Sequence, residues 1–272
     1  MKKTIIVIFV LLTSVILASC SSKEDTNKLR VGIDLSFYPF MYLDDNSTPT
    51  GLEPDLAREF ASYLDMDIEI VNTGFPMLIP GLQSNDLDVV ISDMTVTESR
   101  KENVLFSDPY RFGKTVTLVN KDFAIKNSIT DSMSVETFFS LPGLKAVGVN
   151  GTIGTIIPKK YGATSTSTER AIAIAEVANG ISNVVVGSYT VFGDHNANKD
   201  TTIIYKGIPD VTDSAFVFRK KDTEMVEKAN DFIASLYLEG GIYDTLGTKY
   251  DKIIRDSFFD KTVGLSYIVN KN

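Results

Sequence analysis

Hydrophobic and polar residues alternate in short blocks along the chain, and each block has the period of a strand or of a helix. Residues 29–34 alternate apolar and polar side chains, which is typical of a half-buried strand. Residues 53–64 repeat apolar side chains at helical spacing, with a proline near the first turn. The same pattern predicts strands at 67–71 and 88–91 and a helix at 76–83. This order predicts βαβ units and a mainly parallel sheet.

A second series of elements begins after Tyr110. Because it restarts the same strand and helix alternation, two α/β lobes explain the chain better than one continuous sheet. The predicted strands are 115–119, 145–149, 183–186, 201–205 and 215–218, and the predicted helices are 135–141, 152–161 (bent or broken at Pro158), 168–179 and a long one over 225–236.

The N-terminus has the pattern of an export signal. Lys2 and Lys3 precede an apolar stretch of ~14 residues, shorter than the ~20 that a permanent membrane helix needs. The stretch ends in Leu-Ala-Ser before Cys20, which resembles the lipobox of bacterial lipoproteins, in which the cysteine is lipid-modified and becomes the mature N-terminus. The prediction is a signal peptide over 1–19 and a lipidated tether over 20–28. The alternative is a plain signal peptide with a chance cysteine.

Charge and composition exclude several classes of protein. The chain has 27 basic and 35 acidic residues, a formal charge of −8, whereas a nucleic-acid-binding protein needs basic clusters. One cysteine and one histidine exclude a disulfide framework and a Cys/His zinc site. We therefore expect that the protein binds no nucleic acid, no metal ion and no cofactor.

Motifs of catalysis are absent from the sequence. It contains neither His-Glu-x-x-His nor Gly-x-Ser-x-Gly. His195 lies in a polar stretch that we interpret as a solvated loop, and the acidic pairs at 44–45 and 86–88 are interpreted as solvated turns. The glycine-rich segment 148–154 sits between a strand and a helix, where backbone N–H groups can hold an anion. We therefore expect that the protein is not an enzyme.

The segment 92–110 carries the strongest sign of a binding site. It follows an apolar strand, and open α/β sheets bind ligands at the carboxyl ends of their strands. Thr97 is a suitable N-cap, which places Arg100 in the first turn of a short helix. A cation there opposes the helix dipole unless an anion joins it. The segment therefore predicts an anion site at Arg100, the alternative being an exposed arginine.

This segment, together with residues 31–40, 51–56 and 75–80, resembles the family 3 extracellular solute-binding proteins, which are polar amino-acid receptors of ABC importers. The match runs in consistent order from about Leu29 to Tyr250. It implies an α/β, periplasmic-binding-protein-like (type II) fold, with two α/β lobes joined by two hinge crossovers. The implied first lobe comprises 29–112 and 213–272, and the second comprises 113–212.

The resemblance also implies which residues meet the ligand. Arg100 matches the arginine that grips the α-carboxylate, for which its planar fork of donors is suited. The remaining matches are Phe37 and Phe75, which flank the ligand side chain; Ser92 and Thr95, which contact carboxylate and ammonium; Thr152 and Ile153, whose turn completes the carboxylate site; and Asp34, near the pocket mouth.

One position departs from the family pattern. Ser188 stands where the family has an aspartate that pairs with the α-ammonium. A buried ammonium without a carboxylate partner is costly. Either Asp93, Asp34 or Asp194 replaces that aspartate, with Asp93 the first candidate, or the ligand lacks an ordinary α-amino group.

These features together predict an extracytoplasmic lipoprotein, held at a membrane by its lipid anchor. It would act as a monomer that binds a small carboxylated solute, an amino acid above all, by hinge closure and delivers it to an ABC permease. Two alternatives stay open: a sensory lipoprotein without a transport role, and a dehydratase-like enzyme on the same fold.

Overall fold

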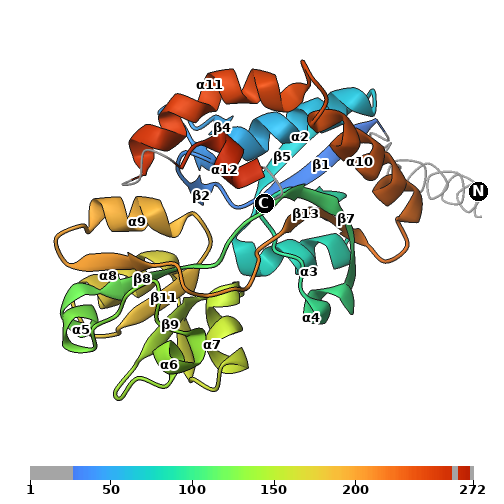
Figure 1. The fold of residues 1–272 in the computed structure, drawn as a ribbon. Helices are drawn as coiled ribbons and strands as arrows, with labels where there is room; N and C mark the ends of the chain where they lie inside the picture. The colour runs from blue at the N-terminus through green and yellow to red at the C-terminus, as the bar shows by residue number, and fades with distance from the viewer. Residues whose placement is uncertain (1–26, 259–262, 270–272) are drawn as a thin grey trace, which may run out of the picture.

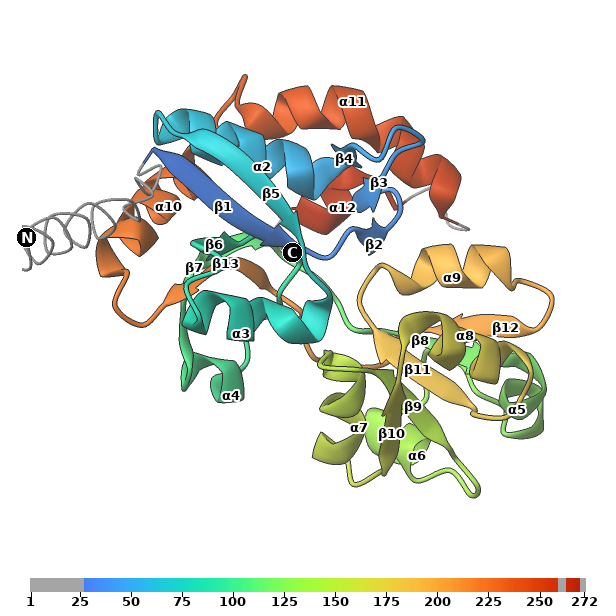
Figure 2. The same cartoon turned by 180° about the vertical axis from the view of Figure 1, so that it is seen from behind.

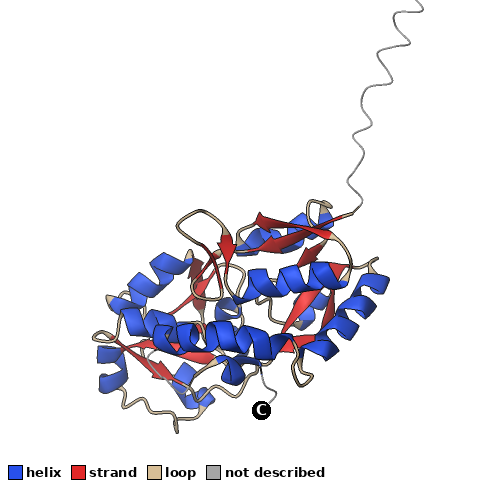
Figure 3. Ribbon diagram, turned by 90° about the horizontal axis from the view of Figure 1, so that it is seen from above, coloured by secondary structure: helices blue, strands red, loops and turns tan. Residues whose placement is uncertain are grey.

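The computed structural model describes residues 27–258 and 263–269, which form two α/β lobes (Figure 1). Each lobe is built on one five-stranded sheet, in the order β5-β1-β6-β13-β7 in the first lobe and β10-β9-β11-β8-β12 in the second. Seen from above, helices lie on the outside of both lobes and strands lie between them (Figure 3). The prediction of two lobes rather than one continuous sheet is confirmed.

The sheet of the first lobe is covered by helices on both faces, because its side chains alternate between two cores. Phe216 packs against Phe60 and Phe232 on one face, where α2, α10 and α11 lie. Its neighbour Val217 packs with Leu78 of α3 on the other face. The elements of this lobe are β1 (Lys28–Ile33), β2 (Ser36–Phe37), β3 (Met41–Leu43), β4 (Pro49–Thr50), α2 (Leu52–Tyr63), β5 (Asp67–Asn72), the 3₁₀ turn η2 (Phe75–Met77), α3 (Leu78–Gln83), β6 (Val89–Val90), α4 (Glu98–Lys101), β7 (Val104–Arg111), β13 (Ser214–Arg219), α10 (Thr223–Leu236), α11 (Ile242–Ser257) and α12 (Leu265–Val269).

The second lobe repeats this plan on a smaller scale (Figure 2). Val184 and Val186 of β11 face one core, and Val185 between them faces the other. The elements are β8 (Val116–Asn120), α5 (Lys121–Lys126), α6 (Val135–Phe139), β9 (Ala146–Val149), the 3₁₀ turn η3 (Ile153–Thr155), α7 (Ile157–Lys160), β10 (Ser165–Thr168), α8 (Arg170–Ala178), β11 (Val184–Gly187), α9 (Val191–Ala197) and β12 (Thr202–Tyr205).

The chain passes between the lobes twice, and the two crossovers are hydrogen-bonded to each other. The N–H of Thr212 donates to the carbonyl of Gly113 at 2.8 Å, and the N–H of Thr115 donates to the carbonyl of Asp210 at 3.1 Å. A Cβ on Gly113 would lie 2.2 Å from the hydroxyl oxygen of Thr212, so glycine permits this close approach. We propose lobe boundaries at these crossovers, near residues 112 and 213.

The sheets are less parallel than the sequence pattern predicted. In the first lobe β1, β5 and β6 run parallel, but β13 is antiparallel to β6 and β7. In the second, β8 is antiparallel to both β11 and β12. The local βαβ units correctly indicate the parallel strands, whereas β7 and β13 pair across more than a hundred residues of sequence.

One prediction about an individual element is wrong, and several elements were not predicted, of which β7 and α11 are the longest. Strand β7 was not predicted; it contains Pro109 and lies at the edge of the sheet, where proline is tolerated. Helix α11 was not predicted either. His195 is buried in α9 rather than solvated, and its Nδ1 lies 2.9 Å from the hydroxyl of Thr202. The helix predicted at 152–161 is broken before Pro158, as expected.

The predicted signal peptide and the lipidation site Cys20 lie outside the described residues. Within residues 27–258 and 263–269, none of the helices combines the length and the apolar character needed to cross a bilayer.

Candidate functional site

A cavity of about 280 Å³ lies between the two lobes and is lined by residues of both. All ten ligand-contact residues expected from the sequence are on its walls: Asp34, Phe37, Phe75, Ser92, Asp93, Thr95 and Arg100 from the first lobe, and Thr152, Ile153 and Ser188 from the second. The structure thus brings the expected set together, and their contacts with a ligand stay a prediction.

Two of these residues follow strands of the first sheet at their carboxyl ends. Asp34 comes directly after β1, and Ser92 follows β6. The hydroxyl oxygen of Ser92 accepts the N–H of Asp34 at 3.0 Å, and the Asp34 carboxylate accepts the N–H of Phe75 at 2.9 Å. These bonds fix the carboxylate and the Phe75 ring against one wall. Only one oxygen of Asp34 has a hydrogen bond to the described residues, so the other remains for a ligand.

Arg100 places a positive charge on the cavity wall. Thr97 caps α4 as predicted, with its hydroxyl oxygen accepting the N–H of Arg100 at 3.4 Å. The guanidinium donates to the carbonyls of Thr95 and, across the cleft at 2.7 Å, Gly151. Burial lowers the pKa of Arg100 to about 10, so it stays protonated at neutral pH. Among the described residues it has no carboxylate within ion-pair distance, so an anion could join it there.

The glycine-rich segment of the second lobe shapes the facing wall. Thr152 caps η3: its hydroxyl accepts the N–H of Gly154 at 3.2 Å and donates to the carbonyl of Val149 at 2.8 Å. A Cβ on Gly148 would lie 2.6 Å from the Gly154 backbone. The glycines therefore let the strand and the turn that follows it approach each other, and the turn carries Thr152 and Ile153 to the cavity.

Asp93, the first candidate for the ammonium partner, is already engaged within the protein. Its carboxylate forms an ion pair with the buried Arg111 and accepts the hydroxyls of Ser214 and, at 3.0 Å, Tyr189. Asp194, another candidate, forms an ion pair with Arg170. Asp34 forms no ion pair within 4 Å among the described residues. The geometry therefore favours Asp34 over the other two.

The buried Arg111 is shared between two carboxylates. Its Nη1 lies 3.1 Å from Oε1 of Glu53, and its Nη2 forms an ion pair with Oδ1 of Asp93. Burial raises the pKa of Glu53 to about 7, with Arg111 opposing that rise. Tyr110 donates its hydroxyl to Glu53 at 2.7 Å. This cluster lies directly behind the cavity wall that Asp93 forms.

Sequence reasoning missed Arg170 and Glu169, which also line the cavity. Arg170 is the first residue of α8, and its guanidinium carbon lies 3.8 Å from the ring centroid of Phe37 in the other lobe. Glu169 accepts the side-chain amide of Asn150 at 3.1 Å. A signal was present, since both residues follow strand β10 at its carboxyl end, but the Ser/Thr repeat of β10 was not interpreted as a strand.

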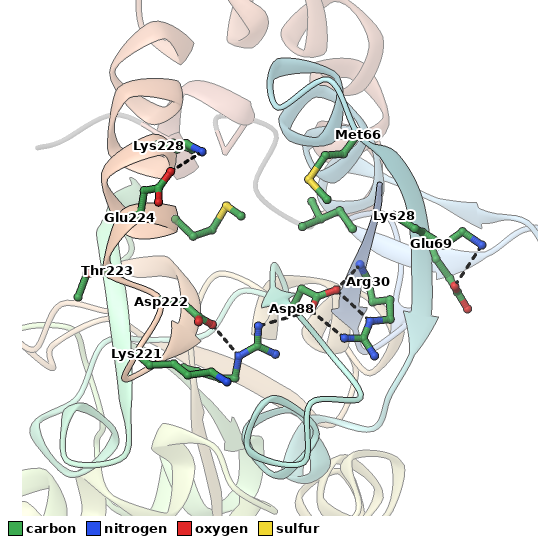
Figure 4. A pocket seen from close by; sticks show the side chains of 13 residues that line it. Lys28, Arg30, Met66, Glu69, Asp88, Lys221, Asp222, Thr223, Glu224 and Lys228 are labelled. Atoms are coloured by element: carbon green, nitrogen blue, oxygen red, sulfur yellow. Dashed lines mark hydrogen bonds and ion pairs between the residues drawn. The ribbon is translucent and has the colours of Figure 1, made fainter. Parts of the chain in front are cut away.

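A second cavity, of about 800 Å³, lies at the opposite end of the first sheet, beside the start of β1 (Figure 4). Most of its charged groups pair with one another. Asp88 lies 2.8 Å from Arg30 and 3.5 Å from Arg219, and Arg219 also binds Asp222 at 2.6 Å. Asp88 is thus half-buried and ion-paired, contrary to the predicted solvated turn. This cavity offers a ligand no unpaired guanidinium, unlike the site at Arg100.

Within the described part of the chain, no group of three or more His, Cys, Asp or Glu side chains is arranged to hold a metal ion. The polar groups of the interlobe cavity are instead two guanidinium groups, carboxylates and hydroxyls beside two aromatic rings. Such a set can bind a small zwitterion through complementary charges.

Comparison with known proteins agrees with this fold. The family model of the bacterial extracellular solute-binding proteins, family 3, matches residues 29–252, and the chain belongs to this family. The chain is 28% identical over 207 residues to the probable ABC transporter extracellular-binding protein YckB of Bacillus subtilis (strain 168), covering 69% of each chain. It is also 28% identical to a probable histidine-binding protein of Campylobacter jejuni, covering 92% of this chain and 99% of that one.

Among solved structures, the ancestral amino acid-binding protein AncCDT-1, a precursor of cyclohexadienyl dehydratase, superposes with a TM-score of 0.69. It is 30% identical, and the match covers 83% of this chain and 96% of that one. The predicted resemblance and the type II periplasmic-binding-protein fold are therefore confirmed.

Proposed function

We propose that this protein is the substrate-binding lipoprotein of an ABC importer and captures an amino acid between its two lobes. The observation that carries the proposal is the interlobe cavity. It is lined by the guanidinium of Arg100, which has no ion-pair partner within 4 Å among the described residues, and by the carboxylate of Asp34, which has one oxygen without a hydrogen bond to them. These two groups match the carboxylate and the ammonium of an amino acid. The relatives named above, one a probable ABC transporter binding protein and one a probable histidine-binding protein, support the same assignment.

The α-carboxylate would bind Arg100, with the turn at Thr152 and Ile153 completing its site from the second lobe. A guanidinium can make two parallel charge-assisted bonds to a carboxylate. The carbonyls of Thr95 and Gly151 each hold one terminal nitrogen, which orients the guanidinium without neutralising its charge.

The α-ammonium would bind the unbonded oxygen of Asp34, in place of the aspartate that Ser188 replaces. Asp34 is fixed by the N–H of Phe75, and its carboxylate keeps one oxygen for the ligand. This assignment changes the order of the sequence-based candidates, because the Asp93 carboxylate is bonded to Arg111, Ser214 and Tyr189.

Hinge closure would couple binding to delivery. Both lobes contribute residues to the cavity. A ligand that contacts both therefore stabilises the closed arrangement relative to an open arrangement. A permease that recognises the closed arrangement would then receive the loaded protein. A sensory lipoprotein would use the same closure for signalling instead.

An enzyme on this scaffold is the second candidate, since a related structure is a precursor of a dehydratase. That reading requires the ligand to be converted. Incubation of the loaded protein, followed by denaturation and mass spectrometry of the released ligand, separates the two functions. Release of unchanged ligand supports the receptor, and release of a dehydrated product supports the enzyme.

The test of binding is isothermal titration of the chain without residues 1–20, refolded to remove any carried-over ligand. The panel is the twenty amino acids with their deaminated and decarboxylated analogues. We expect one amino acid to bind and Arg100→Ala to abolish that binding. The matched control is Lys101→Ala in the same helix, whose amine pairs with Glu98 at 2.9 Å outside the cavity. Binding of no compound in the panel would refute the amino-acid assignment.

A further inference from the structure

We propose that Arg170 determines which side chains the cavity accepts: those that end in an oxygen acceptor, either carboxylate or amide, with cationic side chains excluded. The inference rests on the proposed function and specifies its substrate class. It differs from what the name of the histidine-binding relative suggests. Three features of Arg170 carry it: its place over Phe37, its unused donors and its bond to Asp194.

Arg170 occupies the position that a cationic ligand would use. Its guanidinium carbon lies 3.8 Å from the ring centroid of Phe37, well within the range of a cation–π contact. Both residues line the cavity. A ligand ammonium or guanidinium that approached this ring would find the ring face already covered by the Arg170 guanidinium, whose N–H groups offer a cation no acceptor. The aromatic wall therefore does not favour a cation in the ligand.

Most N–H donors of Arg170 are unused by the protein. Its only hydrogen bond to the described residues runs from Nη2 to Asp194, and its side chain is 26% exposed. A guanidinium has five N–H donors and no acceptor. Because Arg170 lines the interlobe cavity, its remaining donors can bind an oxygen acceptor of a ligand that fills the site.

The bond to Asp194 explains why an amide is accepted as well as a carboxylate. Asp194 is only 16% exposed and compensates the charge of Arg170. The pair therefore presents oriented donors with little net charge, which suit a neutral carbonyl oxygen as well as an anion. The same bond fixes the guanidinium beside Phe37, so its donors are oriented before the ligand arrives.

The acidic residues of the cavity give a cationic side chain little to bind beside Arg170. Asp93 is paired with Arg111, and Asp34 is assigned above to the α-ammonium. Glu169 accepts the side-chain amide of Asn150 through Oε1. Among the described carboxylates of the cavity, this leaves a cationic side chain only the second oxygen of Glu169, which is next to Arg170 in the chain.

The experiment is titration of the chain without residues 1–20 with glutamine, glutamate, asparagine, aspartate, arginine, lysine, histidine and leucine. We expect one of the first four to bind at least tenfold more tightly than the other compounds. Arg170→Met should weaken that binding at least tenfold and reduce the discrimination against arginine and lysine. Lys126→Met, on exposed α5, is the control and should change neither.

Because Arg170→Met leaves Asp194 without its partner, the double variant Arg170→Met with Asp194→Asn is measured as well, with thermal unfolding as the check of folding. Tightest binding of arginine, lysine, histidine or leucine by the unmodified protein would overturn the inference and leave the amino-acid receptor intact. An unchanged ranking in both folded variants would also overturn it. Binding of none of the eight compounds, nor of any other amino acid, would refute the proposed function itself.

Discussion

Tyr189 of the second lobe donates its hydroxyl to the carboxylate of Asp93 in the first lobe at 3.0 Å. The tyrosine ring also lies 4.7 Å from the guanidinium carbon of Arg111 and packs edge-on against Phe40. These contacts lie behind the cavity and need no ligand. The protein itself therefore supplies part of the free energy that holds the two lobes together.

Removing this hydroxyl should weaken ligand binding. In Tyr189→Phe the closed arrangement loses a buried hydrogen bond to a charged group, a contribution of about 1.5–3 kcal/mol, which corresponds to roughly a tenfold or greater loss of affinity. Calorimetry measures the affinity, and small-angle scattering should show a more open ligand-free protein. The control is Tyr205→Phe, which removes a hydroxyl bonded within the second lobe, to the carbonyl of Met133. Equal losses of affinity in both variants would contradict the interlobe role.

Asp34 and Asp93 should respond differently to loss of charge. Asp34→Asn retains an acceptor for the Phe75 N–H but removes the proposed ammonium partner, so affinity should fall at least tenfold with little change in the unfolding temperature. Asp93→Asn removes a partner of the buried Arg111 and should destabilise the fold by about 3 kcal/mol. Calorimetry and thermal unfolding of both variants test this. A loss of affinity confined to the Asp93 variant would restore Asp93 as the ammonium partner.

The stability of the fold should contain a pH-dependent contribution from Glu53. Burial raises its pKa from 4.5 to about 7, so the folded protein holds a proton that the unfolded chain releases. This contribution is fully present below pH 4.5 and is lost as the pH rises through about 7. Arg111, Asp93 and Tyr110 are the groups that face it.

Glu53→Gln should therefore gain stability relative to the unmodified protein as the pH rises from 5 to 8, by at most about 3 kcal/mol. Urea unfolding at several pH values measures the difference, with the exposed Glu98→Gln as the control. A difference that is constant over this pH range would show that Glu53 is ionised throughout.

Cys20 should hold the protein at the membrane. Cys20→Ser removes the thiol that lipidation needs, so the protein should move from the membrane fraction to the soluble fraction of the cell envelope or medium. Mass spectrometry of the unmodified protein should show the added mass of a lipid on the N-terminal fragment. Equal membrane association of both proteins would contradict the anchor.

The sequence was most informative where a local pattern and a ligand-facing position coincide. The strand before Ser92, the N-cap Thr97 and the placement of Arg100 follow from neighbouring residues, and the structure shows each of them. The interpretation of His195 failed for the opposite reason. Its neighbours in sequence are polar, whereas its burial comes from packing beside β12, a contact that local composition does not reveal.

The partners of buried charges were equally inaccessible to sequence reasoning. Arg111 meets Glu53 and Asp93 because the fold of the first lobe brings β7, α2 and the residues after β6 together. Arg170 of the second lobe meets Phe37 of the first only where the two lobes come together. Charge pairing of this kind depends on tertiary distance and leaves no periodic pattern. The family resemblance indicated residues that line the cavity, and the contacts of its carboxylates are the basis for proposing Asp34 as the ammonium partner.

The position of β13 affects the order in which the protein can fold. This strand lies between β6 and β7 in the first sheet, yet it follows the whole second lobe in the sequence. A chain emerging from the ribosome or the export channel therefore completes the contiguous second lobe while the first sheet still lacks its inner strand. The early strands β1, β5, β6 and β7 must remain protected from aggregation until β13 arrives, which is the kind of delay that long-range pairing imposes.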